Sequence, residues 1–79
     1  ESEVRLVQDA EIWAARLDTG VEVIHLLSPG RRAWLQVARG EVHVEGQALR
    51  AGDGAAITDV EQIAVRAGTD AELLLFDLA

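Results

Sequence analysis

The sequence predicts an all-β fold, a small antiparallel barrel of short strands. Apolar and polar residues alternate with a period of two along several segments, whereas helical periods do not recur. Turn-forming residues follow one another about every 6–12 positions, a spacing typical of short antiparallel strands. The chain has 79 residues, of which 49% are hydrophobic, so it is long enough for one thin-cored domain and too apolar to be disordered.

Four strands are expected in the first half of the chain, over 4–8, 11–17, 21–27 and 33–38. The turns between the later ones are Asp18-Thr19-Gly20 and Ser28-Pro29-Gly30, since Gly admits positive φ and Pro lacks the ladder donor. A helix over 9–17, capped by Asp9, is the alternative for the second segment. We favour the strand because Val7, Ile12 and Trp13 do not form a helical apolar stripe.

Five further strands are expected in the second half, over 41–45, 47–50, 55–58, 62–66 and 72–78. Gly40 and Gly46 mark two of the turns, and the runs 51–54 and 68–70 mark two more. No internal repeat or linker interrupts the series. We therefore expect one domain over 1–79.

Charge and composition exclude several classes of partner. Fourteen acidic residues against seven basic ones give a net charge of −7, and only Arg31-Arg32 forms a basic pair, so neither nucleic acid nor an anionic membrane surface is an expected partner. No cysteine is present, which removes disulfides and thiolate chemistry. No apolar run approaches the ~20 residues of a membrane helix. We expect a cytoplasmic protein.

The origin of the chain is left open by its composition. It begins with Glu1 instead of Met, as expected of a processed or excised end. Lys, Asn, Tyr, Met and Cys are all absent. Either a GC-rich genome or an engineered sequence accounts for that absence.

The segment from Trp34 to Ile57 resembles the centre of a cupin. Alternating valines between Gly40 and Gly46, followed by Gly52-Asp53 before an apolar strand, fit the cupin hairpin and its closing turn. More narrowly, the runs 31–37, 53–59 and 72–78 resemble the C-terminal domain of pirin-like bicupins, which are often described as quercetin 2,3-dioxygenases. The resemblance covers about 4–78 and implies a cupin jelly-roll barrel whose catalytic metal sits in the N-terminal cupin of the same protein.

The resemblance also implies where metal ligands would lie. A metal-binding cupin carries His-x-His, a following Glu and a third His. Counted from Gly40, those positions hold residues without ligand groups of the right type, namely Leu26, Ser28, Ala33 and Gln62 or Ile63. The sequence therefore predicts no metal site, no cofactor and no catalytic residue.

Two other groups of residues could form sites. Glu41, His43 and Glu45 stand on one face of a predicted strand and could chelate a cation, but alternation alone predicts a solvent-facing row, which we favour.

The second group consists of possible cavity-lining residues, His25, Trp34 and Gln36. Trp34 and Gln36 share a strand face and would either line a cavity for a flat aromatic ligand or fill the core, with filling favoured. For His25, a partly buried, hydrogen-bonded side chain is favoured over a ligand or an acid–base group.

These observations predict a non-catalytic structural cupin domain. In a full-length parent it would pack on the N-terminal cupin domain, and alone it would self-associate, as a two-fold dimer. One alternative is a cupin that binds flavonoid-like small molecules. Another is part of a quercetin 2,3-dioxygenase whose metal site lies in an N-terminal domain outside this chain.

Overall fold

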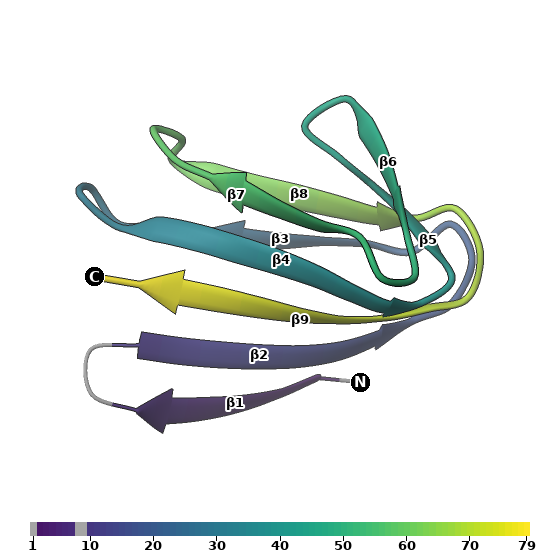
Figure 1. Ribbon diagram of the computed structural model, residues 1–79, viewed down its shortest axis with the longest axis horizontal. Coiled ribbons are helices and arrows are strands. Elements are labelled where there is room, and N and C mark those ends of the chain that lie inside the picture. Colours follow the sequence, from purple (N-terminus) through teal and green to yellow (C-terminus); the bar gives the residue numbers. More distant parts are fainter. Residues whose placement is uncertain (1, 8–9) are drawn as a thin grey trace.

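The protein folds into nine β-strands, as seen in a computed structural model that describes residues 2–7 and 10–79, with side chains from residue 10 onward (Figure 1). The strands are β1 (Ser2–Val7), β2 (Ala10–Leu17), β3 (Glu22–Leu26), β4 (Arg32–Arg39), β5 (Glu41–Val44), β6 (Gln47–Arg50), β7 (Gly54–Ile57), β8 (Gln62–Ala67) and β9 (Ala71–Leu78). The predicted all-β class is confirmed, and each predicted strand has a counterpart whose bounds differ by at most two residues. Gln8 of the first predicted strand and Asp9, the predicted cap of the alternative helix, lie outside the described residues.

The alternative helix over 9–17 is wrong, since β2 occupies this segment. Its residues pair with β1 on one side and with β9 on the other, and these ladder bonds outweigh the local helix preference of the alanines. The part of the chain that the structure describes contains no helix, and hence none able to cross a membrane.

The strands form two antiparallel sheets that face each other (Figure 1). One has five strands in the order β1-β2-β9-β4-β7, and the other has four in the order β3-β8-β5-β6. The last strand in sequence, β9, therefore lies in the middle of the five-stranded sheet, between β2 and β4.

The core lies between the sheets and is built by alternation. In β4 the buried positions are Ala33, Leu35 and Val37, and in β9 every second residue from Ala71 to Asp77 is buried. Ile63 and Val65 of β8 face them from the other sheet. Because the largest core side chains are aliphatic, stability depends on close packing of many medium-sized groups.

Gly40 fixes the turn between β4 and β5. Its φ of 77° is one that residues with a Cβ rarely adopt, and a Cβ there would collide with the backbone oxygen of Asp70. Thr69 adds a side-chain bond, its Oγ1 accepting from the backbone N–H of Glu41 at 3.0 Å. The turn before β9 is thereby pressed against the start of β5.

One side of the sandwich is closed and the other is open. On the closed side, β6 of the four-stranded sheet contacts β4 of the five-stranded sheet. On the other side, β3 ends its sheet and, among the described strands, pairs only with β8, while β1 extends the opposite sheet beyond β2. The open side, between β2 and β3, is where the candidate site lies.

Candidate functional site

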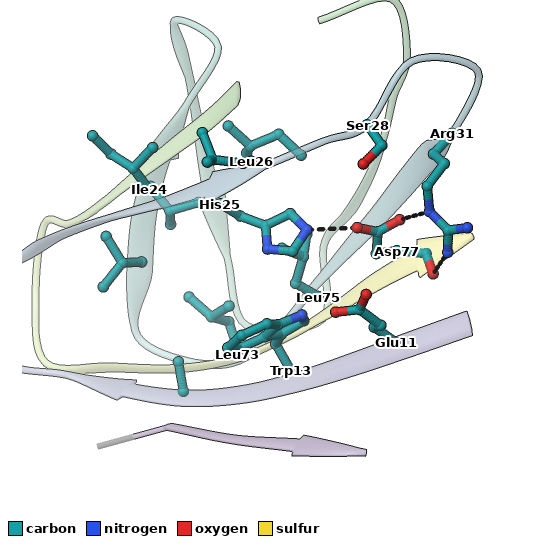
Figure 2. A pocket seen from close by; sticks show the side chains of 14 residues that line it. Glu11, Trp13, Ile24, His25, Leu26, Ser28, Arg31, Leu73, Leu75 and Asp77 are labelled. Atoms are coloured by element: carbon teal, nitrogen blue, oxygen red, sulfur yellow. Dashed lines mark hydrogen bonds and ion pairs between the residues drawn. The ribbon is translucent and has the colours of Figure 1, made fainter. Parts of the chain in front are cut away.

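A cavity of about 620 Å3 lies between the two sheets on the open side (Figure 2). Apolar side chains of β3, β8 and β9 form most of its wall, with Trp13 of β2 closing the side opposite His25. Polar groups gather at one end, from Glu11, His25, Ser28, Arg31 and Asp77. The result is a mostly apolar recess with a charged, hydrogen-bonded end.

Asp77 is the centre of the polar end. Alternation along β9 turns it inward, and only 4% of its surface is exposed. Its Oδ2 accepts a hydrogen bond from Nε2 of His25 at 2.7 Å, and its Oδ1 accepts one from Nε of Arg31. Nη2 of Arg31 also donates to the backbone oxygen of Asp77 at 3.0 Å. The guanidinium group therefore holds both the side chain and the backbone of one residue.

The Asp77 carboxyl stays charged despite its burial. Burial disfavours the carboxylate and acts to raise the pKa, but hydrogen bonds from Arg31 and His25, together with the positive charge beside it, more than offset this. The pKa of Asp77 is therefore lowered from its ordinary value of 3.8. A buried carboxylate of this kind is stable only while its partners remain in place.

Trp13 forms the wall below His25. The two rings meet edge to face, with centroids 5.4 Å apart and planes at 68°. The Trp13 indole N–H is buried and has no hydrogen-bond acceptor in the described structure. The contact holds the imidazole between an aromatic ring and the Asp77 carboxylate.

Of the three predicted cavity-lining residues, only His25 lies at the cavity. Trp34 and Gln36 lie on the outer face of β4, opposite in direction to Leu35, and Trp34 is 40% exposed. This differs from both the lining and the filling position expected from the sequence. Period-two alternation correctly put the two residues on one face of β4. It could not say that this face is the outer one, which follows from burial of the Leu35 face against the core.

Trp34 and Gln36 instead belong to a surface cluster with Gly54. Nε1 of Trp34 donates to Oε1 of Gln36 at 3.2 Å, and Nε2 of Gln36 donates to the backbone oxygen of Asp53 at 3.1 Å. The Trp34 ring covers Gly54 so closely that a Cβ there would collide with it. The indole ring thus packs over a glycine of the neighbouring strand β7.

The positions that the cupin resemblance assigns to metal ligands do not fit a metal. Leu26 is 73% exposed, and Ala33 and Ile63 are buried in the core. Ser28 lines the cavity, with a hydroxyl in place of an imidazole. Among the residues with described side chains, no group of three His, Cys, Asp or Glu residues could hold a metal ion.

The row of Glu41, His43 and Glu45 does not form as predicted. Glu45 leaves the strand for a turn with φ of 49°, because β5 ends at Val44. Glu41 contacts Nε2 of His43 at 3.2 Å and Nε of Arg50 at 3.1 Å. The two remaining members are therefore engaged with each other and with Arg50.

Asp77 and Arg31 were not singled out from the sequence. One signal was available, since Asp77 interrupts an alternating apolar strand at a position that should be buried. A buried acid in such a strand requires a cationic partner. The partners of Asp77 come from β3 and the β3–β4 turn, which are 46–52 residues away in sequence, so local patterns could not identify them.

Comparisons with known proteins agree on a single family. A family model described as "Quercetinase C-terminal cupin domain" matches residues 1–78. The quercetin 2,3-dioxygenase of Escherichia coli K12 is 35% identical over 78 residues, which are 99% of this chain and 34% of that protein. A pirin-like protein of Caulobacter vibrioides is 41% identical over 71 residues, covering 90% of this chain and 31% of that protein.

A solved structure gives the same result. The crystal structure of the bacterial pirin YhhW from Escherichia coli, in complex with nickel(II), superposes with a TM-score of 0.88 at 38% identity. The alignment covers 90% of this chain and 31% of that one. This chain thus spans about a third of the length of the relatives it matches.

Proposed function

The chain belongs to the family of quercetinase C-terminal cupin domains, and from this premise we propose that it is a non-catalytic structural domain that packs against a neighbouring cupin domain. The cupin fold and the resemblance to the C-terminal domain of pirin-like bicupins, both predicted from the sequence, are confirmed. About two thirds of the length of the relatives lies outside the matched part, which supports a partner domain within a longer protein.

The observation that carries the proposal is the exposed apolar surface of β3. Ile24 is 56% exposed and Leu26 is 73% exposed, on the strand that ends the four-stranded sheet. Burying such side chains contributes about 25 cal/mol per Å2 of apolar surface. A surface of this kind is suited to packing against another domain.

Two features support a non-catalytic role. The positions of the cupin ligands carry Leu26, Ser28, Ala33 and Gln62 or Ile63, none of which supplies an imidazole or carboxylate. The strongest polar group of the cavity, the Asp77 carboxylate, is already engaged by Arg31 and His25. A transition metal retained in stoichiometric amount after dialysis against a chelator would contradict this role, as would dioxygen uptake with quercetin by the chain alone.

Self-association of the isolated chain tests the packing role. We expect a two-fold dimer at micromolar concentration, which sedimentation velocity detects as a species of twice the monomer mass, because the apolar side chains of β3 otherwise face water. Leu26→Glu is expected to yield a monomer, whereas Gln47→Glu, an exposed change on β6, leaves the dimer intact. A monomeric unsubstituted chain would contradict self-association.

The cavity favours small-molecule binding as a second candidate function. Its volume of about 620 Å3 and mostly apolar wall are those of a typical ligand pocket. Quercetin is the natural probe because the relatives are named for it. A concentration-dependent rise in melting temperature with quercetin, and none with a disaccharide of similar size, is expected; no shift with quercetin would remove this candidate.

A third possibility concerns the longer protein as a whole. It would be a quercetin 2,3-dioxygenase whose metal site lies in another domain, with this domain as its support. The names of the curated relatives favour this. Metal analysis and dioxygen uptake on a longer protein that contains this domain test it, and a longer protein that is inactive with added metal would count against it.

A further inference from the structure

The edge of β3 carries backbone groups that point away from the sheet. Leu27 donates its N–H to Glu61 at 2.9 Å and Val21 accepts from Ala67 at 2.9 Å, so odd-numbered residues of this segment face β8. In an antiparallel strand the intervening residues direct both N–H and C=O to the opposite edge. Those of Ile24 and Leu26 therefore point to an edge along which no described strand runs.

The two sheets differ in width on this side. The cavity lining shows that β3 and β8 face β2 and β9, and β6 contacts β4 on the other side. The five-stranded sheet continues through β1, while the four-stranded sheet stops at β3. In the described part of the chain, no strand of the four-stranded sheet lies opposite β1.

Both faces of this edge carry apolar side chains, and the inner face also carries His25. Val23 and His25 pair with the buried residues Val65 and Ile63, so they point inward, to the cavity. Ile24 and Leu26 alternate with them along β3 and are largely exposed, at the rim of the same cavity. One more strand beside β3 would thus meet an apolar cavity on its inner face and apolar side chains on its outer face.

We propose that the free edge of β3 accepts one extended polypeptide segment as an additional strand of the four-stranded sheet. Its inward side chains would enter the cavity, and its outward ones would cover Ile24 and Leu26. The inference rests on the proposed packing role and names the form of the partner, a β-strand supplied by another part of a longer protein. Main-chain hydrogen bonds provide the affinity in this mode of recognition, and alternate side chains provide the specificity.

The chemistry of the segment follows from its surroundings. Inward positions that meet Leu73 and Leu75 on the cavity floor must be apolar (Figure 2). Outward positions favour Arg or Lys because the chain has a net charge of −7, although Glu22 on that face of β3 is paired with Arg66 of β8. The long stems of these cations also cover apolar neighbours.

A single strand suits this edge better than a second copy joined through its own β3. In such a symmetric pair, the partner's β3 would lie opposite β1, and the partner's β2 would then take the space that β1 fills. This overlap arises because each five-stranded sheet extends one strand beyond β3. A single added strand avoids this overlap, because it would lie opposite β1 and bring no second sheet with it.

The probe is a blocked octapeptide that alternates valine with arginine, titrated into the 79-residue chain. We expect amide hydrogen exchange of Ile24 and Leu26 to slow by about tenfold or more on binding, as their N–H groups gain acceptors. In an added antiparallel strand whose valines point inward, the arginine amides face β3, so their N-methylation is expected to abolish binding. N-methylation of the valine amides is expected to preserve it.

Two variants at one position supply matched controls in the protein. Ile24→Pro removes a donor that β8 does not use, and edge strands tolerate proline, so it should fold and lose peptide binding. Ile24→Thr keeps the donor and should bind. Unchanged melting temperatures of both free variants show that folding is intact; if Ile24→Pro does not fold, the N-methylated peptides decide.

Several results would overturn the inference. These are no peptide binding, protection at another edge such as β1 or β6, or equal effects of the two N-methylated peptides. A chain that dimerises without binding the peptide would contradict the proposal of an added strand but not the proposed packing role. A monomeric chain that binds the peptide would support the added strand and contradict the proposed self-association.

Discussion

His25 and Asp77 join the two sheets of the sandwich across its open side. His25 lies on β3 of the four-stranded sheet and Asp77 on β9 of the five-stranded sheet, with Nε2 and Oδ2 2.7 Å apart. Among the described strands, no ladder connects the two sheets at this point. The hydrogen bond therefore holds β3 over the cavity, and Arg31 fixes the carboxylate that makes it.

Replacing Asp77 by Asn is expected to destabilise the domain by about 1–3 kcal/mol. The change leaves the Arg31 guanidinium beside a neutral group and removes the charge that His25 contacts. Urea unfolding followed by circular dichroism measures the loss. Asp59→Asn, the same chemical change at an exposed turn position, serves as control and should stay within about 0.5 kcal/mol.

Acid should weaken the unsubstituted domain more than the Asp77→Asn variant. The pKa of Asp77 is lower in the folded than in the unfolded chain, so its carboxylate contributes stability at pH values above the ordinary value of 3.8. That contribution is lost as the pH falls from there through the folded pKa. Unfolding free energies measured from about pH 7 to about pH 2 should therefore converge for the two proteins. Parallel curves would contradict the prediction.

Asp70 should contribute to the same acid sensitivity from another place. Hydrogen bonds from the backbone N–H and hydroxyl of Thr19 lower the pKa of this exposed carboxyl. Its contribution is likewise present above the unfolded pKa and lost in acid. Asp70→Asn should remove part of the pH dependence that remains in the Asp77→Asn variant, whereas an unchanged profile would show that the Thr19 contacts do not matter in solution.

Gly54→Ala is expected to cost about 1–3 kcal/mol through collision with the Trp34 ring. The same substitution in a Trp34→Ala background should cost much less, since the obstructing ring is gone. Thermal unfolding of the four proteins in this double-mutant cycle measures the coupling. Equal costs in the two backgrounds would mean that the ring does not cover Gly54.

Leu35→Ala and Leu26→Ala should differ widely in their effects. Leu35 is 0% exposed between the sheets, so its truncation leaves a cavity and should cost about 2–5 kcal/mol. Leu26 is 73% exposed in the isolated domain, and its truncation should change the stability of the monomer by less than about 0.5 kcal/mol. Chemical denaturation at concentrations too low for self-association separates the two.

Strand positions were readable from the sequence because alternation and turn residues are local. Val42 and Val44 alternate with polar neighbours, and Gly40 and Gly46 mark the turns beside their strand, so nine segments could be predicted closely. The helix over 9–17 was a competing local signal, and pairing with β9 decided against it.

The candidate site was less predictable because it depends on register between distant strands. His25 could be placed on an inward face, but its partner Asp77 lies 52 residues away and meets it across two sheets. The outward position of Trp34 has a similar origin, since packing of Leu35 against Ile63 and Val65 of the other sheet determines which face of β4 is buried.

The central place of β9 has a consequence for how the protein is made. During synthesis β2 and β4 leave the ribosome well before the strand that joins them, and neither pairs directly with the other. The five-stranded sheet therefore cannot assemble until Ala71–Leu78 has emerged. Until then β2 and β4 present unpaired edges, to which chaperones or other chains can bind. Pairing with β9 covers these edges in the folded domain.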